Sequence, residues 1–326
     1  MGKTVLGVDI GCDSVKLALC KNGIMKKTAV VPMPMDLMKN NRITSLETMG
    51  ELLRDALKKN RIRTGRAALV LPNELSYVRT VSTPVMNAEQ LMYNIPFEFN
   101  DYIEDEPQNY LFDYAMLSNP KADHAATMQL MAVAAPKVLL EEMRVFLNKA
   151  GMKLVKVAPV EYVYISLIRS AGQRLGLDRE YCILDLGYNA VRMFMYHGDR
   201  HEVTRILEIG MRNLDEAVAE NYATDIHLAH TYFVSNYEDC QNQEYCLNAY
   251  NTIAVELMRA VNFYRFSNPD VQLTDIWISG GGGAVKGLRD AISETLGMPI
   301  RSASELAGLE DQDDTLFAQA VGITME

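Results

Sequence analysis

The sequence predicts an α/β protein built from two similar halves, with a small α+β module inserted into the first half. Three observations support this prediction. The chain has 326 residues, enough for about two domains. The strand-and-turn pattern of residues 8–11 returns at residues 184–187. Between the two copies, residues 73–135 show a different order of elements, typical of a separate module.

The first half is predicted to begin with strands and one helix. Thr44 and Glu47 form a capping-box pattern before an apolar stripe at helical spacing. The strand after that helix ends at Pro72. The predicted strands are residues 5–9, 15–21, 28–32 and 67–71.

The inserted module is predicted to pair a helix with three strands, at residues 76–83, 110–117 and 127–134. Asn87 can cap the helix, and Pro96 is expected to kink it. Its apolar positions are Leu91, Ile95 and Phe99. A polar turn, residues 118–124, separates the last two strands.

Pro136 is then suited to the first position of a helix, followed by a strand at residues 154–158 and a helix from about residue 159. The predicted boundaries are therefore residues 1–72 and 136–175 for the first lobe, 73–135 for the inserted module, and 176–326 for the second lobe.

The composition is that of an ordinary globular protein, with 48% hydrophobic and 23% charged residues. We find no apolar run of about 18 residues and no signal-peptide pattern, so we expect a cytoplasmic protein without membrane insertion. A net charge of -10 argues against nucleic-acid binding. Five cysteines without a C-x-x-C pair favour free thiols. We interpret the basic stretch at residues 58–66 as a solvated loop.

The repeat carries an Asp and a Gly at the same place in both halves. Asp185 follows Asp9 by 176 residues (185 − 9), and the same offset aligns Lys16 with Arg192. Glycine lets backbone N–H groups approach an anion, and an Asp beside them suits a divalent cation between carboxylate and phosphate. The alternative is that each Asp only closes its turn by bonding the local backbone. Because the pattern occurs twice in register, we favour a nucleotide clamp.

A third glycine site follows the apolar strand at residues 276–278. Ser279 leads into four glycines and then a helix with Val285, Leu288, Ile292 and Leu296. Such a loop allows a base or ribose to pack on the backbone near a helix N-terminus. The spacing fits neither a Rossmann fingerprint nor a Walker A loop.

Taken together, Asp9-x-Gly11 with Lys16, the second Asp185-x-Gly187, and the Ser279–Gly282 loop resemble the phosphate-1, phosphate-2 and adenosine motifs of the actin/Hsp70/sugar-kinase superfamily. Within it the chain resembles the PilM family of type IV pilus assembly proteins, which is related to FtsA. The resemblance implies an actin-like (ribonuclease H-like) duplicated fold, two lobes around a nucleotide cleft, and an SHS2-like subdomain at residues 73–135.

The resemblance also implies a function: a cytoplasmic ATP-binding scaffold, with ATP or ADP and Mg²⁺ as cofactors and no assigned catalytic residue. Asp9 and Asp185 would hold Mg²⁺ through water. The implied nucleotide-binding residues are Asp9, Gly11, Cys12, Asp13, Ser14, Lys16, Asp185, Gly187, Asn189, Gly210, Gly280, Gly281 and Gly282.

The implied partners are the cytoplasmic tail of a PilN-like membrane protein and other pilus-assembly components, with homo-oligomers possible. This partner would hold the chain at the inner face of the cell membrane. A related secretion or competence system, an actin-fold ATPase or kinase, and an FtsA-like division filament protein remain alternatives.

Two segments depart from the family pattern. Lys156 and Ala158 stand where relatives carry acidic residues that could orient water for hydrolysis, and we expect the nearby Glu161 to face solvent. His230 and Phe233 lie where relatives have a Glu and Lys framing the adenosine. These two side chains can stack on a base or pack in the core, and the sequence leaves both open.

Overall fold

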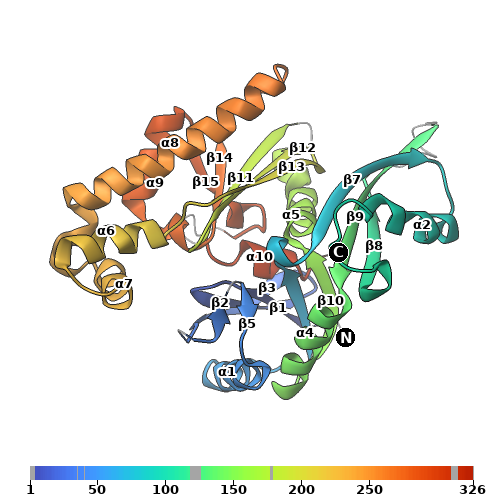
Figure 1. The fold of residues 1–326 in the computed structure, drawn as a ribbon, viewed down its shortest axis with the longest axis horizontal. Coiled ribbons are helices and arrows are strands. Elements are labelled where there is room, and N and C mark those ends of the chain that lie inside the picture. The colour runs from blue at the N-terminus through green and yellow to red at the C-terminus, as the bar shows by residue number, and fades with distance from the viewer. Residues whose placement is uncertain are drawn as a thin grey trace. The chain divides into compact units, whose positions relative to one another are not determined.

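The computed structural model describes residues 4–34, 36–39, 41–117, 126–176, 179–309 and 315–325 (Figure 1). The predicted polar turn at 118–124 lies outside them. The chain divides into two compact units, which are described separately. The first contains Met1–Arg169, Asp199–His201 and Gln319–Glu326, and the second contains Ser170–Gly198 and Glu202–Ala318.

A five-stranded sheet forms the centre of the first unit, in the order β10-β6-β1-β2-β3. β1 and β2 are antiparallel, whereas β6 and β10 run parallel to β1. Leu6, Val8 and Leu17 lie in its fully buried core. The strands are β1 (Thr4–Ile10), β2 (Ser14–Lys21), β3 (Ile24–Pro32), β6 (Arg66–Leu71) and β10 (Lys153–Pro159).

Two helices of this unit pack together and bury apolar residues in the same core: α1 (Leu46–Lys59) and α4 (Lys137–Lys149). Helix α1 begins one residue later than the capping box predicted. Ser45, not Thr44, is the cap, and its Oγ accepts a hydrogen bond from the N–H of Thr48. Glu47 instead pairs with Lys149 of α4. A pair of short strands, β4 (Met38–Lys39) and β5 (Arg42–Ile43), precedes α1.

The inserted module has a three-stranded antiparallel sheet in the order β7-β9-β8, with β7 at Tyr77–Pro84, β8 at Tyr110–Met116 and β9 at Thr127–Pro136. Helix α2 (Ala88–Asn94) is capped by Asn87, as predicted. At Pro96 the α-helix gives way to a 3-10 helix, η2 (Ile95–Phe99), because proline lacks the N–H that an α-helix needs.

The predicted apolar stripe of this helix is confirmed, since Leu91, Ile95 and Phe99 are all buried in the module's own core. A second 3-10 helix, η3 (Pro107–Asn109), precedes β8. Pro136 ends β9 and lies just before α4, one position earlier than predicted. After β10, helix α5 (Val160–Leu175) begins close to the predicted place.

The sheet of the second unit has the order β13-β12-β11-β14-β15. When this order is read from its other end, β15, β14, β11, β12 and β13 correspond to β10, β6, β1, β2 and β3 of the first sheet. The predicted duplication is therefore visible in the topology. The strands are β11 (Glu180–Leu186), β12 (Val191–His197), β13 (Arg200–Leu207), β14 (Ile276–Ser279) and β15 (Ile300–Ser302).

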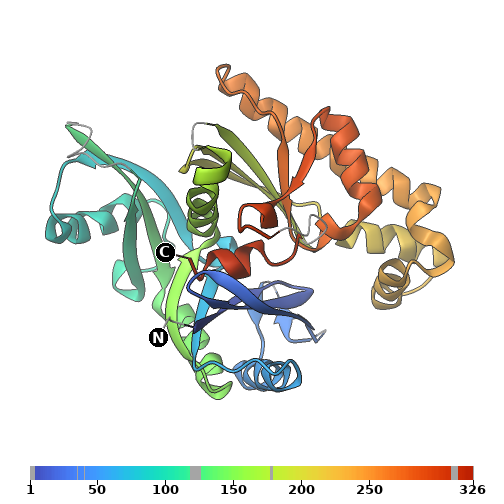
Figure 2. The ribbon, with the colours of Figure 1, turned by 180° about the vertical axis from the view of Figure 1, so that it is seen from behind.

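The helices of the second unit are α6 (Arg212–Tyr222), α7 (Ile226–Ser235), α8 (Glu244–Ser267) and α9 (Lys286–Leu296). Helices α8 and α9 lie side by side (Figure 2). The described part of this unit also contains the 3-10 turns η4 (Tyr237–Asn242), η5 (Gly281–Ala284) and η6 (Ala303–Glu305).

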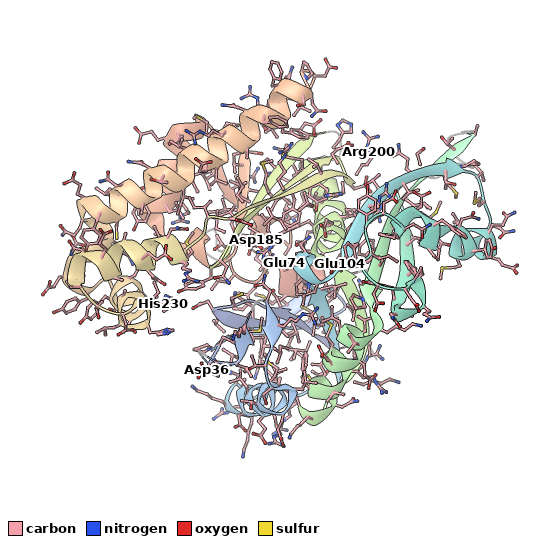
Figure 3. The ribbon with its side chains drawn as sticks, viewed as in Figure 1. Asp36, Glu74, Glu104, Asp185, Arg200 and His230 are labelled. Carbon is pink, nitrogen blue, oxygen red and sulfur yellow. The ribbon has the colours of Figure 1, made fainter. Side chains whose placement is uncertain are left out.

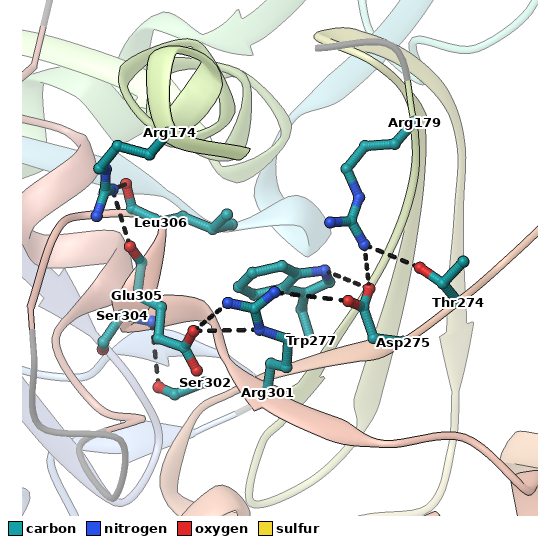
Figure 4. A network of polar contacts seen from close by, with 10 residues as sticks. All are labelled: Arg174, Arg179, Thr274, Asp275, Trp277, Arg301, Ser302, Ser304, Glu305 and Leu306. Carbon is teal, nitrogen blue, oxygen red and sulfur yellow. Dashed lines mark hydrogen bonds and ion pairs between the residues drawn. The ribbon is translucent and has the colours of Figure 1, made fainter. Parts of the chain in front are cut away.

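A polar network surrounds the single tryptophan at one end of this sheet (Figure 4). Trp277 is fully buried and donates its indole N–H to Asp275. Asp275 also accepts from Arg179 at 2.6 Å and lies 3.7 Å from Arg301. The guanidinium of Arg301 stacks over the Trp277 ring, 4.4 Å from its centroid. The two arginines therefore satisfy one carboxylate and cover the ring, which fixes this end of the sheet.

The last described helix, α10 (Ala318–Gly322), packs on the first unit, as the sequence indicated. A Cβ on Gly7 of β1 would lie 1.7 Å from the carbonyl oxygen of Ala320. A Cβ on Gly322 would lie 2.7 Å from Val163 of α5. Glycine at both positions therefore allows the backbone of α10 to approach β1 and α5 closely.

Candidate functional site

The two predicted turns occupy equivalent places in the two sheets. In the β1–β2 hairpin Asp9 lies opposite Lys16, and in the β11–β12 hairpin Asp185 lies opposite Arg192. Directly opposite residues of antiparallel strands have neighbouring side chains, so each turn pairs an acid with a base. The alignment of Lys16 with Arg192, expected from the sequence offset, is confirmed by the strand register.

In the first turn the amino group of Lys16 lies close to Gly11. The N–H of Gly11 donates to the carbonyl of Ser14, and Lys16 Nζ donates to the same carbonyl at 3.3 Å. A Cβ on Gly11 would lie 3.0 Å from Lys16 Nζ. Lys16 is only 8% exposed, so its amino group is held at the turn rather than spread in solvent. A fixed cation beside a glycine turn suits an anion such as a phosphate.

Cys12 and Asp13 form the tip of the same turn. The thiol of Cys12 donates to the side-chain oxygen of Asn41, and the carbonyl of Asp13 accepts from the N–H of Met33. Ser14 is buried at the start of β2. The structure thus brings together all the predicted residues of this first turn.

The second turn is closed by backbone groups, since the N–H of Gly187 donates to the main-chain carbonyl of Asp185. The carboxylate of Asp185 instead lies 3.7 Å from Arg192. Gly210 packs against this turn, because a Cβ there would lie 2.4 Å from the carbonyl oxygen of Tyr188. Asn189 is exposed at its tip. In this copy the Asp side chain is therefore not what closes the turn, which argues against the turn-closing alternative.

The glycine loop reaches the second turn from β14. Asp185 pairs in register with Ser279, and a Cβ on Gly280 would lie 2.6 Å from Asp185 Oδ1. Gly280 has φ +85°, a conformation that favours glycine. A Cβ on Gly282 would lie 2.5 Å from Met211 Sδ, whereas one on Gly281 would meet nothing within 4 Å. Asp185, Gly210, Gly280 and Gly282 are thus gathered at one edge of the second sheet (Figure 3 labels Asp185).

Thr315 is part of this cluster, and the sequence reasoning missed it. Its hydroxyl donates to the carbonyl of Gly280 and its own carbonyl accepts from the N–H of Gly280. A Cβ on Gly283 would lie 2.5 Å from its side chain. Thr315 follows an acidic stretch with no motif of its own, so no local signal could have identified it.

The prediction that Glu161 faces solvent is wrong. Glu161 is 2% exposed at the start of α5, and its Oε1 accepts a hydrogen bond from Asn73 Nδ2. Asn73 opens η1 (Asn73–Leu75) directly after β6. Strands β1, β6 and β10 are adjacent and parallel, so Asp9, Asn73 and Glu161 all lie at the carboxyl edge of one sheet. Ligands of open α/β sheets bind at this edge.

Asn73 also marks the counterpart of the glycine loop. Val8 pairs with Leu69, and its equivalent Leu184 pairs with Ile278, so Leu69 and Ile278 are equivalent. Asn73 and Gly282 each lie four residues further along the chain (73 − 69 and 282 − 278) and are therefore equivalent too. Both strands run into a 3-10 turn at this point, η1 in one unit and η5 in the other. The first unit therefore carries an amide, which bonds the buried carboxylate of Glu161, where the second carries glycine.

His230 pairs with a buried acid. Its Nδ1 lies 2.8 Å from Asp215 Oδ2, and Asp215 is 1% exposed on α6 (Figure 3 labels His230). The ring of Tyr188 meets the imidazole edge to face, with centroids 5.8 Å apart. Phe233 is 5% exposed in the second unit's core. Packing thus accounts for Phe233, and the pair with Asp215 fixes His230.

No group of three or more His, Cys, Asp or Glu side chains is placed to hold a metal directly in the described part of the chain. The first turn offers the carboxylates of Asp9 and Asp13 instead, and the second offers that of Asp185. That arrangement fits Mg²⁺, which retains several waters and takes only one or two carboxylates.

A protein-family model described as type IV pilus assembly protein PilM matches the chain over residues 7–317. The chain belongs to the PilM family. A comparison with curated proteins found no match.

Several solved structures are similar to this chain in fold. A PilM–PilN type IV pilus biogenesis complex matches with TM-score 0.82 and 21% identity, covering 98% of this chain and 97% of that one. The ethanolamine utilization protein EutJ of Carboxydothermus hydrogenoformans matches with TM-score 0.62 and 14% identity, over 99% and 89% of the chains. MreB 5 of Spiroplasma citri, bound to AMPPNP, matches with TM-score 0.53 and 12% identity, over 98% and 94%.

The predicted actin-like fold of this PilM family member is therefore confirmed. None of its described helices is long and apolar enough to cross a membrane. The individual nucleotide-binding residues and the lobe boundaries stay predictions.

Proposed function

We propose that this chain is an ATP-binding scaffold of type IV pilus assembly. One observation carries the proposal: each unit presents a glycine turn with an aspartate facing a cation, in the same strand register. Solved actin-like relatives support nucleotide binding, because MreB 5 carries AMPPNP.

The chemistry of each residue suggests its role in binding the nucleotide. Lys16 and the backbone of Gly11 to Ser14 would bind phosphate oxygens, and Asp9 and Asp185 would hold the waters of Mg²⁺. Gly187, Asn189 and Gly210 would bind from the second turn, and Gly280 to Gly282 would carry the adenosine of ATP or ADP. Mg²⁺, when bound, would neutralise charge on the phosphates.

Calorimetric titration with ATP and Mg²⁺ tests this proposal. Asp9→Asn and Asp185→Asn are each expected to weaken binding at least about tenfold, the size of one charge-assisted contact. Asp55→Asn, at an exposed position on α1, is the matched control and should bind as the wild type does. Wild-type protein that takes up no nucleotide, or variants that bind equally well, would contradict the proposal.

The proposed partner is the cytoplasmic tail of a PilN-like inner-membrane protein, which would hold the chain at the inner face of the membrane. The solved relative is a PilM–PilN complex, which supports this assignment. A pull-down with the PilN-like tail encoded in the same genome is expected to retain the chain. Failure to bind at high micromolar tail concentration would count against the partner, while leaving the nucleotide proposal standing.

Slow hydrolysis is a second candidate function, favoured by the buried Glu161 carboxylate at the edge that carries Asp9. A carboxylate there can orient a water, which the sequence had not indicated. We expect Glu161→Gln to abolish any turnover while leaving nucleotide affinity within about threefold. Turnover near about 1 per second that depends on Asp9 would replace the scaffold with an enzyme.

A further inference from the structure

Helix α2 and the 3-10 turn after it expose large apolar side chains on their outer side. Met92, Tyr93 and Phe97 are 46%, 73% and 58% exposed, and the rings of Tyr93 and Phe97 lie 5.9 Å apart. We call these three residues the aromatic face. Leu91 and Ile95, on the inner side, already supply the core of the module. The fold of the module therefore does not explain the aromatic face, and contiguous exposed apolar groups mark interaction sites.

The segment that carries the aromatic face is strongly acidic. Residues 80–117 contain seven Asp and Glu and no Lys or Arg. The exposed acids of this stretch are Glu89, Asp101, Glu104, Asp105, Glu106 and Asp113. The preceding cation, Arg79, stacks over the ring of Tyr102 at 4.2 Å and bonds the carbonyl of Glu98. A positively charged partner surface would therefore be electrostatically complementary to this segment.

The first unit itself carries such a surface at the other edge of its sheet. The β2–β3 hairpin, the end of α1, and the starts of β6 and β10 meet there, since Lys153 pairs with Arg66 and Lys27 Nζ donates to the carbonyl of Arg61. We call the exposed cations of these segments the basic edge. They are Lys26, Lys27, Lys58, Lys59, Arg61, Arg63, Arg66 and Lys153.

The charge of the basic edge is not neutralised within the described residues, where none of its eight side chains forms an ion pair. An apolar side chain, Ile24, stands among them and is 62% exposed. The stretch 58–66, interpreted from the sequence as a solvated loop, is thus part of a broader cationic surface.

We propose that the aromatic face of one copy of this chain docks on the basic edge of a second copy. Arginines bind well over aromatic rings, and both residue types are enriched in protein interfaces. Opposite local charges would steer the contact although each copy carries a net charge of -10. Neither surface contains any of the proposed nucleotide-binding residues.

The contact joins two different surfaces, so it is head-to-tail. Helix α2 and the end of α1 lie on separate parts of the first unit (Figure 1). Each bound copy therefore still offers one free surface of each kind, and assembly can continue beyond a dimer.

Sedimentation velocity of the full chain tests the proposal at protein concentrations on the order of 100 µM, where weak contacts populate. The wild type is expected to associate at low salt and to dissociate near 1 M salt, where the screening length falls to about 3 Å. Tyr93→Ser/Phe97→Ser and Lys59→Glu/Arg63→Glu should each reduce association at least about fivefold. Phe266→Ser and Arg265→Glu, at exposed positions on α8, are the matched controls and should associate as the wild type does.

Mixing the two variants gives the decisive measurement. The aromatic-face variant keeps its basic edge and the basic-edge variant keeps its aromatic face, so the mixture should form one-to-one dimers and nothing larger. A wild type that stays monomeric at low salt, variants that associate undiminished, or a mixture without dimers would each overturn the proposal. Binding of the monomer to anionic vesicles through the basic edge, with no self-association, would also overturn it in favour of a lipid surface.

Discussion

Replacing Gly7 with alanine is expected to lower the free energy of unfolding by at least about 3 kcal/mol, the upper end for overpacking a core. The new Cβ would lie 1.7 Å from the carbonyl oxygen of Ala320 and 2.7 Å from its carbonyl carbon. These are main-chain atoms of α10, so no side-chain rotation relieves the overlap. Either β1 must distort or α10 must leave the first unit.

Urea denaturation measures the free energy of unfolding of Gly7→Ala, with Gly65→Ala as the control. A Cβ on Gly65 would meet nothing within 4 Å, so that control should stay within about 0.5 kcal/mol of the wild type. Gly322→Ala, which would meet side chains of Val163 and Leu167, should fall between the two. A Gly7→Ala variant as stable as the control would show that α10 does not pack on β1.

Replacing Gly280 or its neighbour Gly281 with alanine is expected to affect stability very differently. Gly280→Ala should lose about 2–4 kcal/mol of stability, because φ is +85° and the Cβ would lie 2.6 Å from Asp185 Oδ1 and 2.8 Å from the carbonyl of Leu186. Gly281→Ala should fold as the wild type does, because a Cβ there would meet nothing within 4 Å.

The Gly281→Ala variant distinguishes an effect on ligand binding from an effect on folding. If adenosine packs on this loop, Gly281→Ala should keep the wild-type Tm yet bind ATP with Mg²⁺ at least about tenfold more weakly, since its methyl occupies space the ligand needs. Thermal unfolding and calorimetry on the same samples measure both quantities. Unchanged affinity in Gly281→Ala would remove this loop from the proposed adenosine contact.

Local pattern was enough to predict most elements and the duplication. Strands β1 and β2, the stripe Leu91–Ile95–Phe99 and the Asn87 cap are confirmed because alternation, helical spacing and capping are short-range signals. The cap of α1 was misplaced by one residue, since Thr44 and Ser45 offer the same hydroxyl and only the backbone conformation selects between them.

Glu161 shows where local reasoning failed. A glutamate in the first turn of a helix is usually exposed, and nothing beside it in the sequence suggested otherwise. Its partner Asn73 is 88 residues away, and the two meet only because β6 and β10 lie side by side in the sheet. With Glu161 buried at that edge, the absence of acids at positions 156 and 158 no longer implies that the site has no carboxylate.

By itself the sequence determined the repeated Asp-x-Gly turns, the glycine loop after β14 and the family they resemble. All of these depend on residues adjacent in the chain. Only the tertiary structure decided that Thr315 bonds Gly280, that α10 lies against Gly7 and that Glu161 is buried. Each of these contacts joins segments distant in the chain, and their pairing depends on sheet order and close packing, which periodicity does not encode.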